Sequence, residues 1–309
     1  MNVPALVVVL LAAAAGVADA GERQLQIAGL SVTTWSSDAA PGPQPVIVFS
    51  HGLHGCGTQS RFLMEAFASA GYLVFAPNHR DAGCGGRGSR GRSGGASVTA
   101  PLGKPAQWTS ATYRDRADDI ARLVGGLRGD DRYRERVDWA RLALAGHSLG
   151  GYTVLGLAGA WPDWKLAGVK AVLALSPYSQ PFQSQNTLAG VSVPVMYQGG
   201  TLDVGITPWL RKAQGTYDQT PPPKYFVEFK AAGHLAWTNL TATAHESIVK
   251  YSLAFMNHYV KGQAPEAVLT QARADVSALR YASELGFSGP GKASGRNGTP
   301  PRTLGRRGR

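Results

Sequence analysis

A short stretch in the middle of the chain constrains the fold more than any other. It runs from Ala143 to Gly151 and reads Ala-Leu-Ala-Gly-His-Ser-Leu-Gly-Gly. The apolar residues that lead into it are typical of a buried strand, and the small and apolar residues after it are typical of a helix. A strand that turns sharply into a helix leaves no room for a Cβ atom beside the bend, which accounts for Gly146 and Gly150. The sequence therefore predicts a strand-turn-helix unit with Ser148 at its apex.

The position of Ser148 at this bend has a chemical consequence. The hydroxyl is expected to project from the edge of the sheet where parallel strands end. The backbone N–H of Leu149 opens the following helix and is expected to face a negative charge that develops beside the serine. A Gly-x-Ser-x-Gly pattern alone occurs by chance in glycine-rich chains. The strand before it and the helix after it favour a nucleophilic serine.

The chain has 309 residues, which suits one large α/β domain. Residues 3–18 are almost wholly apolar and run into Ala18-Asp19-Ala20, a small-x-small cleavage pattern. We therefore predict a signal peptide over residues 1–20 and a secreted or periplasmic protein. Because this segment carries no Lys or Arg, an uncleaved hydrophobic N-terminus is the alternative. The segment is short for a transmembrane helix and no later stretch is longer, so we expect no integral membrane segment in the mature chain.

Positive charge is concentrated at the C-terminus. The formal net charge is +11, and the six Lys and Arg residues of residues 288–309 leave +5 for the rest of the chain. This stretch is rich in Gly, Pro and Ser and has almost no apolar surface to bury, so we predict a disordered basic tail after a single domain over residues 21–287. The tail lacks interleaved aromatic residues, and we expect no nucleic-acid partner.

Two cysteines, Cys56 and Cys84, fit an exported protein with one disulfide bond. Each follows a predicted buried strand, so both are expected on loops at the same edge of the sheet. Two separate thiols are the alternative.

Apolar runs and periodicity predict alternating strands and helices along the chain. Strands are expected at 23–27, 31–35, 45–50, 72–76, 142–145, 169–175, 193–197 and 225–230, the first two as an antiparallel hairpin. Helices are expected at 61–70, 111–127, 208–215 and 246–260, with another spanning Leu269 to Leu279, and loops at 77–110 and 176–191. This order predicts an α/β fold with a mostly parallel central sheet and helices on both faces. The Gly-x-Gly-x-x-Gly match at 83–88 opens no helix, so we do not expect dinucleotide binding.

The chain offers the partners that a nucleophilic serine needs. A serine hydroxyl requires a base to take its proton and a carboxylate to hold that base in the right tautomer. Asp203 follows the strand at 193–197 and is assigned as the acid, with Asp218 in reserve. His234 follows the strand at 225–230, where a loop reaches back over the sheet edge, and is assigned as the base. The other histidines lie in earlier loops, beside the serine or on the late helix: His51, His54, His79, His147, His245 and His258.

Acyl transfer also needs donors for the oxyanion of the tetrahedral intermediate. Leu149 is expected to supply one backbone N–H. The loop after the strand at 45–50 is expected to supply the other, and Leu53, which follows His51-Gly52, is the best placed residue. A plain glycine-rich turn is the alternative.

Three stretches together resemble the α/β-hydrolase superfamily: Phe49-Ser50-His51-Gly52-Leu53, residues 71–77 and Gly146-His147-Ser148-Leu149-Gly150-Gly151. The resemblance covers roughly residues 46–259. It is to the branch that holds dienelactone-hydrolase-like proteins, platelet-activating-factor acetylhydrolases and bacterial cutinase-like polyesterases. True dienelactone hydrolases carry Cys where this chain has Ser148. The resemblance implies the α/β-hydrolase fold, and hydrolysis of carboxylic esters through an acyl-enzyme, without cofactor or metal, by Ser148, Asp203 and His234.

The sequence therefore favours an exported serine esterase or lipase acting on small or polymeric esters. The alternatives are perhydrolysis as in haloperoxidase-like proteins, a peptidase with the same triad, and a non-catalytic binding module. Few residues separate the strands at 169–175 and 193–197, so we expect no large helical lid. Aromatic walls for the substrate are expected from Tyr178, Phe182 and Trp237, with packing of any of them on the core as the alternative. The oligomeric state is left open.

Overall fold

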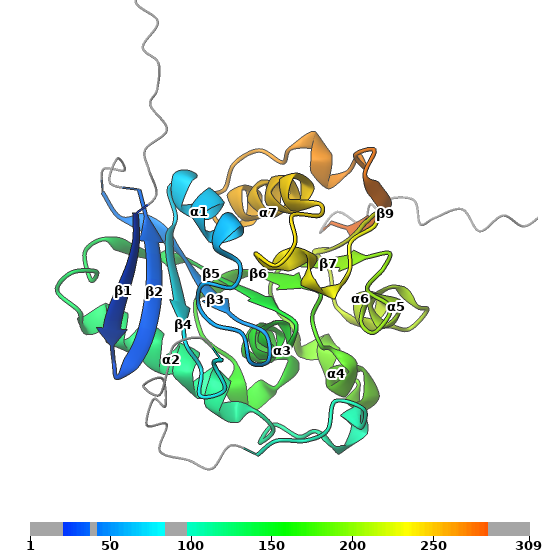
Figure 1. Ribbon diagram of the computed structural model, residues 1–309, viewed down its shortest axis with the longest axis horizontal. Helices are drawn as coiled ribbons and strands as arrows, with labels where there is room; N and C mark the ends of the chain where they lie inside the picture. The colour runs from blue at the N-terminus through cyan, green and yellow to red at the C-terminus, as the bar shows by residue number, and fades with distance from the viewer. Residues whose placement is uncertain (1–20, 38–41, 84–97, 284–309) are drawn as a thin grey trace, which may run out of the picture.

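The computed structural model describes residues 21–37, 42–83 and 98–283 (Figure 1). The strands are β1 (Gly21–Ile27), β2 (Leu30–Ser36), β3 (Gln44–Ser50), β4 (Leu73–Pro77), β5 (Val137–His147), β6 (Val169–Leu175), β7 (Val195–Gly200), β8 (Lys224–Phe229) and β9 (Val276–Ala282). The α-helices are α1 (Arg61–Ser69), α2 (Arg114–Gly129), α3 (Leu149–Leu155), α4 (Gln180–Gln185), α5 (Thr207–Arg211), α6 (Thr216–Gln219) and α7 (His245–Tyr259). The predicted signal peptide, the predicted basic tail and Cys84 lie outside the described residues.

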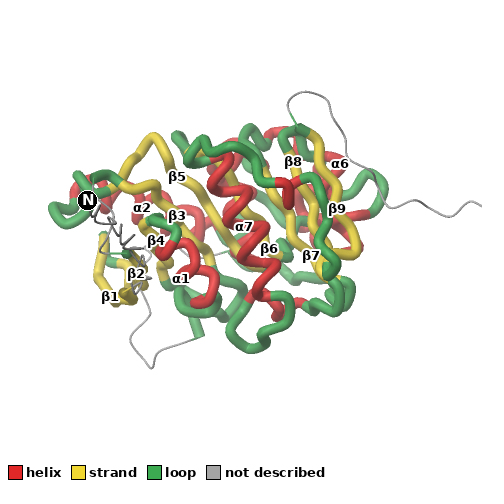
Figure 2. The backbone as a smooth tube through the Cα atoms, turned by 90° about the horizontal axis from the view of Figure 1, so that it is seen from above, coloured by secondary structure: helices red, strands yellow, loops and turns green. Residues whose placement is uncertain are grey.

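All the strands form one sheet in the order β1-β2-β4-β3-β5-β6-β7-β8-β9. The six strands from β4 to β8 in this order are parallel, while the β1-β2 hairpin and β9 run antiparallel at the two edges. Helices α1 and α7 lie together on one face (Figure 2), and α2 and α3 cover the other. The predicted mostly parallel sheet with helices on both faces is confirmed.

Strand β3 shows why the middle of the sheet reads as a continuous apolar run. Val46 and Val48 point into the core under α2 and α3, whereas Ile47 and Phe49 point into the core under α1 and α7. Successive side chains of a strand alternate between its faces, so a strand covered on both sides must be apolar throughout. All seven residues of β3 are buried. This packing fixes the position of the loop that follows β3.

The prediction of a helix through Leu269 to Leu279 is wrong. Only a short 3₁₀ turn, Ala267–Leu269, forms there, and β9 pairs with β8. Apolar residues at Val276 and Leu279 fit either periodicity, and the pairing with β8 decides between them because it satisfies an otherwise open sheet edge. Tyr281 stacks on its cross-strand partner Tyr225 with ring centroids 6.2 Å apart.

Two other predicted boundaries also change. Helix α2 begins at Arg114 rather than at residue 111, because Tyr113 has a left-handed backbone with φ of 54° and cannot belong to the helix. The segment 176–191 is not a plain loop, since it contains α4 and a 3₁₀ turn, Thr187–Gly190. Among the described residues, no helix has both the length and the apolar character needed to cross a membrane.

The residues that precede the two cysteines lie side by side. The N–H of Gly83 donates to the carbonyl of Gly55 over 3.0 Å, and a Cβ on Gly83 would lie 2.6 Å from the carbonyl oxygen of His54. Cys56 and Cys84 follow these two glycines directly. The disulfide stays a prediction, but this backbone contact supports it.

We expect Cys56 and Cys84 to form one intramolecular disulfide bond. Closing a loop of this length is expected to stabilise the fold by about 3 kcal/mol, by restricting the unfolded chain. Thiol titration of the denatured, unreduced protein should find no reactive thiol, and a reduced sample serves as the positive control. Two thiols in the unreduced sample would contradict the pairing.

Candidate active site

Ser148 lies between the end of β5 and the start of α3, with φ of 56° and ψ of −116°. The bend is as tight as the sequence predicts. A Cβ on Gly146 would lie 2.3 Å from the carbonyl oxygen of Gly150, and a Cβ on Gly150 would lie 1.9 Å from the carbonyl oxygen of Ser50. Real Cβ atoms essentially never come this close to another atom, so both positions need glycine. The strained backbone of Ser148 turns its hydroxyl away from the sheet.

The fold brings Ser148, His234 and Asp203 together. His234 follows β8 and opens a short 3₁₀ turn, His234–Trp237, and Asp203 follows β7. His234 Nε2 lies 2.9 Å from Ser148 Oγ, and His234 Nδ1 lies 3.3 Å from Asp203 Oδ1. The carboxylate side chain is 2% exposed and the imidazole 36%. The reserve acid Asp218 lies on α6 and pairs instead with Arg280.

A fourth side chain, Ser176, lies between the imidazole and the carboxylate. Its Oγ is 2.8 Å from His234 Nδ1 and also contacts Asp203 Oδ2. A carboxylate only accepts hydrogen bonds, so the Ser176 hydroxyl donates to Asp203 and accepts from the Nδ1–H of His234. With its proton on Nδ1, the imidazole presents an unprotonated Nε2 to the hydroxyl of Ser148.

The two predicted oxyanion donors flank Ser148. Leu149 is the first residue of α3, where a backbone N–H has no acceptor within the helix. Leu53 lies in the loop after β3, and its N–H has no acceptor among the described residues. The groups on either side of it are all bound: Gly52 N–H donates to Gln59 Oε1 over 3.0 Å, and His54 N–H donates to Asp81 Oδ2 over 3.1 Å. The loop is therefore held so that the N–H of Leu53 is left available.

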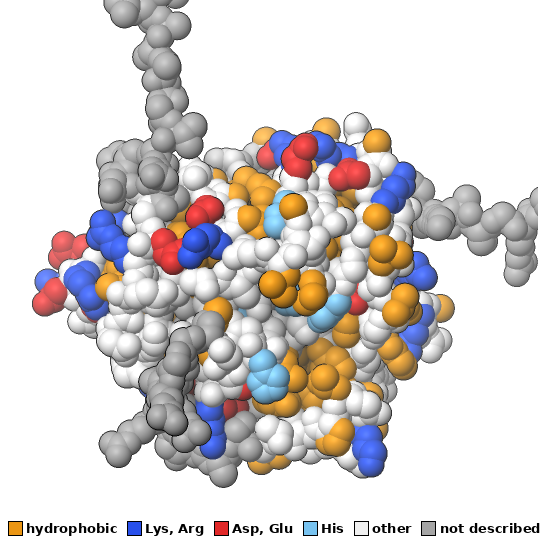
Figure 3. All heavy atoms as spheres, viewed as in Figure 1, with side chains coloured by type: hydrophobic (Ala, Val, Ile, Leu, Met, Phe, Trp, Pro, Cys, Tyr) orange, Lys and Arg blue, Asp and Glu red, His pale blue; other side chains and the backbone are white. Residues whose placement is uncertain are grey.

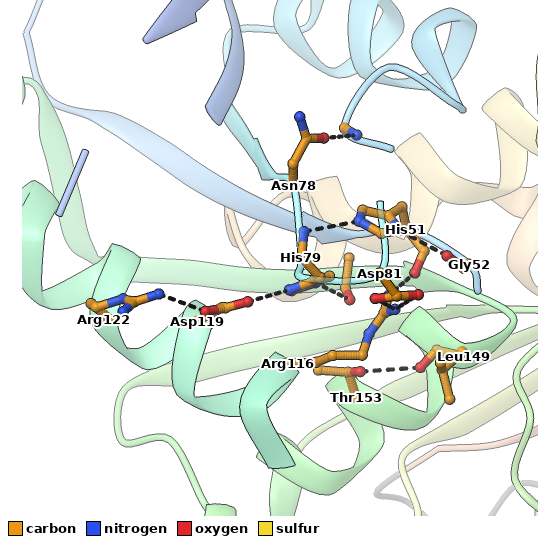
Figure 4. Close-up of polar contacts among 12 residues, drawn as sticks. His51, Gly52, Asn78, His79, Asp81, Arg116, Asp119, Arg122, Leu149 and Thr153 are labelled. Carbon is orange, nitrogen blue, oxygen red and sulfur yellow. Dashed lines mark hydrogen bonds and ion pairs between the residues drawn. The ribbon is translucent and has the colours of Figure 1, made fainter. Parts of the chain in front are cut away.

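A buried ionic cluster anchors this loop from below (Figure 4). The fully buried guanidinium of Arg116 donates to both carboxylate oxygens of Asp81, over 2.7 and 2.8 Å, and to the carbonyl of His51. Burial acts to raise the pKa of Asp81, but Arg116, the backbone N–H of His54 and the nearby histidines together outweigh it and hold the pKa below its ordinary value. Removing one partner of such a pair typically costs about 3–5 kcal/mol. The loop is thus tied to α2 by charge at His51 and at His54.

Two of the histidines that sequence analysis set aside belong to the same cluster. Burial, with Arg116 nearby, holds the pKa values of His51 and His79 well below the ordinary value, so both rings are neutral. His79 bridges Ser50 Oγ, at 2.9 Å, and Asp119 Oδ2, at 3.0 Å. These neutral rings join the end of β3 to α2 without adding positive charge to the cluster.

His147 connects the loop that carries Leu53 to His234. Since Gln59 Oε1 accepts from Gly52, its amide nitrogen donates to His147 Nδ1 over 2.9 Å. The other ring nitrogen, Nε2, then carries the proton and donates to the carbonyl of His234 over 2.9 Å. Burial, with His234 close by, lowers the pKa of His147 to about 3. The sequence analysis predicted that His147 is not the base, and the structure gives it this bridging position.

Two cavities open on either side of Ser148 and share Leu53, Leu102 and His234. The smaller, about 540 Å³, is walled by Tyr178 and Trp209 among others, and the larger, about 670 Å³, by polar groups that include Thr238 and Asn239. Six large hydrophobic side chains that line the cavities are exposed: Leu102, Leu202, Val204, Trp209, Leu235 and Leu240. Hydrophobic side chains accordingly gather near histidine side chains in the middle of the face seen in Figure 3.

Of the three predicted aromatic walls, only Tyr178 lines a cavity. Phe182 and Trp237 are fully buried in the core and have to be removed from the predicted substrate-binding residues. Phe182 stacks on Tyr152 with ring centroids 4.9 Å apart. Trp237 donates its indole N–H to Gln198 over 2.9 Å. Large apolar side chains are buried on average, as both of these are.

The part of the chain that the structure describes holds no group of three or more His, Cys, Asp or Glu side chains arranged to bind a metal ion. The residues that the sequence analysis missed are Ser176, Gln59, Arg116 and Asp81. A polar residue directly after β6, the strand between those that lead to Ser148 and to Asp203, was the available signal for Ser176. No sequence pattern pointed to the others.

Comparison with known proteins gives two family matches. The model of the PET hydrolase-like family matches residues 114–273, and that of platelet-activating factor acetylhydrolase, isoform II, matches residues 30–85. "Cutinase 2" of Thermobifida cellulosilytica is 34% identical over 129 residues, 41% of this chain and 44% of the relative. "Cutinase cut1" of Thermobifida fusca is 34% identical over 129 residues, 41% of this chain and 36% of the relative. The match thus spans less than half the length of these curated relatives.

The buried, neutral His147 makes stability depend on pH. In the unfolded chain its pKa is near 6.5, so below that pH the unfolded chain binds a proton that the folded chain, with a pKa of about 3, does not. Stability is therefore lost as pH falls from about 6.5 toward 3. For this one group the expected loss at about pH 5 is about 2 kcal/mol.

The variant His147→Gln tests this, since an amide can keep both hydrogen bonds but does not titrate. Urea unfolding is measured for both proteins at about pH 7.5 and about pH 5, and the variant should gain about 2 kcal/mol relative to the wild type at the lower pH. An equal difference in stability at the two pH values would show that His147 takes up its proton in the folded state.

Proposed function

Because the chain belongs to the PET hydrolase-like family, we propose that it hydrolyses carboxylic esters, with Ser148 as nucleophile, His234 as base and Asp203 as acid. The observation that carries the proposal is the 2.9 Å contact between His234 Nε2 and Ser148 Oγ. A base within hydrogen-bonding distance, itself oriented by a buried carboxylate, is the arrangement that activates a serine hydroxyl. Relatives named as cutinases support an ester as the substrate.

The reaction follows from the positions of these groups. His234 Nε2 takes the proton of Ser148 as Oγ attacks the ester carbonyl, and the backbone N–H groups of Leu53 and Leu149 bind the oxyanion. The imidazolium then gives its proton to the leaving alkoxide, which departs as the alcohol and leaves an acyl-enzyme on Ser148. Water, deprotonated by the same Nε2, attacks this acyl group, and the carboxylic acid departs as Ser148 regains its proton. No cofactor is required.

The two cavities support a substrate with groups on both sides of the scissile bond. Their shared residues, Ser148 among them, support binding of the ester beside Ser148, and the exposed apolar side chains around the openings favour small esters or accessible segments of a polymer. Between β6 and β7 the described chain contains α4, of six residues, which is too short to be a helical lid. Leu102, Gly103 and Pro105, from the connection after β4, form one wall of the smaller cavity.

We expect Ser148→Ala to abolish ester hydrolysis while the protein remains folded, because only the nucleophilic oxygen is removed. The expected loss of kcat is on the order of 10⁴-fold or more. Turnover of p-nitrophenyl butyrate and labelling by a fluorophosphonate probe are measured together. Ser184→Ala serves as the matched control, since that hydroxyl donates to the carbonyl of Pro181, away from the site.

Loss of both signals in the Ser148 variant alone is the expected result. Turnover close to that of the wild type in pure Ser148→Ala would refute the proposed nucleophile. Turnover of an anilide, measured in parallel, tests for peptidase activity. Turnover of a peracid-forming mixture tests for perhydrolysis.

Substrate size provides a second test. An open site offers little apolar surface to a long acyl tail, whose burial would contribute ~0.8 kcal/mol per methylene group. We expect kcat/KM to be higher for p-nitrophenyl acetate or butyrate than for the palmitate, with no rise in activity at a lipid interface. Preference for the palmitate, or sharp interfacial activation, would indicate that the connection after β4 closes over the site.

A further inference from the structure

We propose that Ser176 is a positioning residue of this active site. Its hydroxyl accepts a hydrogen bond from the Nδ1–H of His234 and donates one to Asp203, and so links the carboxylate to the imidazole. The proposal rests on the proposed function, because it assumes that His234 acts as the base. It adds to the triad a residue whose hydroxyl, rather than the carboxylate, is the direct hydrogen-bond partner of the base.

The fold places Ser176 at the centre of the site. It follows β6, which lies between β5, the strand leading to Ser148, and β7, the strand leading to Asp203. Its backbone N–H donates to the carbonyl of Gln198 in β7 over 2.8 Å, and the carbonyl before it, of Leu175, accepts from the N–H of Ser148 over 3.0 Å. Ser176 is thus fixed by the backbone to both of its neighbours in the sheet.

The backbone conformation of Ser176 is strained. Its φ of 41° lies in the left-handed region, which residues with a Cβ rarely adopt, and the residue is fully buried. Such strain persists where the surrounding structure enforces it, and it often marks functional positions. Here the strained turn directs the hydroxyl into the space between His234 and Asp203.

The distances identify Ser176 Oγ as the acceptor of the hydrogen bond from the Nδ1–H of His234. Nδ1 of His234 is 2.8 Å from Ser176 Oγ but 3.3 Å from Asp203 Oδ1, and the longer distance exceeds that of a normal N–H···O bond. The hydroxyl uses its single proton to donate a hydrogen bond to Asp203 Oδ2, so a lone pair of Oγ is left to accept from the imidazole N–H. Thr207 Oγ1 approaches the same Oδ2 at 3.4 Å and has no contact with the ring.

This arrangement separates two roles that one aspartate usually combines. Ser176 holds the tautomer of His234, and Asp203 orients the hydroxyl and supplies the negative charge that stabilises the imidazolium. In the variant Asp203→Asn, the Ser176 hydroxyl can donate to the amide oxygen and still accept the Nδ1–H. The charge is then lost while the tautomer is kept.

The first experiment compares Ser176→Ala with Ser179→Ala. Ser179 is equally buried and its hydroxyl bonds Thr216 over 2.6 Å, outside the triad, so it controls for the loss of a buried hydroxyl. With p-nitrophenyl butyrate, we expect Ser176→Ala to lower kcat about 10-fold while KM stays within about twofold, because the lost interaction stabilises the transition state. The Ser179 variant should keep its kcat. Equal kcat values in the two variants would overturn the proposal.

The second experiment adds Asp203→Asn alone and together with Ser176→Ala. Without the Ser176 hydroxyl, the amide nitrogen of the introduced asparagine can turn toward the ring and impose the wrong tautomer. The double variant should therefore lose at least about 10-fold more in kcat than the product of the two single losses. If Asp203 held the Nδ1–H directly, Asp203→Asn alone would already impose the wrong tautomer, and adding Ser176→Ala would cost no more than it does alone.

A third measurement uses the wild-type protein and so remains valid if Ser176→Ala does not fold. In ¹H NMR spectra, the Nδ1–H of His234 should appear as a downfield resonance with nuclear Overhauser contacts to the β protons of Ser176. His234→Ala identifies the resonance. Contacts to the Asp203 β protons without any to Ser176 would overturn the proposed bond. If Ser148→Ala shows no catalytic role for Ser148, the proposed function fails, whereas this spectroscopic result stands independently.

Discussion

The close approach of Gly150 to the carbonyl of Ser50 determines where the candidate active site lies. A Cβ at position 150 would lie 1.9 Å from that oxygen, so the start of α3 and the end of β3 touch only because glycine is present. The contact places the first N–H of α3, that of Leu149, next to the loop that carries Leu53. It also sets Ser148 between them. A side chain at 150 would push apart the N–H groups of Leu149 and Leu53, the two proposed oxyanion donors.

The loop that carries Leu53 is rich in glycine. It can adopt many conformations and therefore needs a restraint from the rest of the chain. The chain supplies this restraint with charge rather than with packing: Arg116 and Asp81 bind the backbone at His51 and at His54. Burying a guanidinium is unfavourable unless its charge is paired, and here a carboxylate and a carbonyl accept hydrogen bonds from its two terminal nitrogens. The gain is a loop whose position does not depend on a substrate to order it.

The α/β-hydrolase fold and the cutinase-like branch predicted from three sequence stretches are confirmed by the family matches. Local signals sufficed where strand, bend and helix follow one another directly, as around Ser148. They failed at β9, since its pairing with β8 comes from a part of the chain far away in sequence. They also failed for Phe182 and Trp237, because whether a side chain points into the core depends on how the whole fold packs. Ser176 and Gln59 were missed for the same reason: each acquires its role only from partners that the fold brings near.

Three buried histidines support the candidate site, His147 beside His234 and the pair His51 and His79 in the cluster under the loop that carries Leu53. His51, His79 and His147 are all buried, and burial lowers the pKa of each, so none carries charge at neutral pH. A cation beside His234 would oppose the formation of the imidazolium on which both proton transfers depend. Neutral rings instead offer one donor and one acceptor each, which is what a chain of fixed hydrogen bonds needs. The candidate site therefore uses histidine in two ways: as rigid, uncharged connectors within the protein, and once, at the partly exposed His234, as the proposed general base.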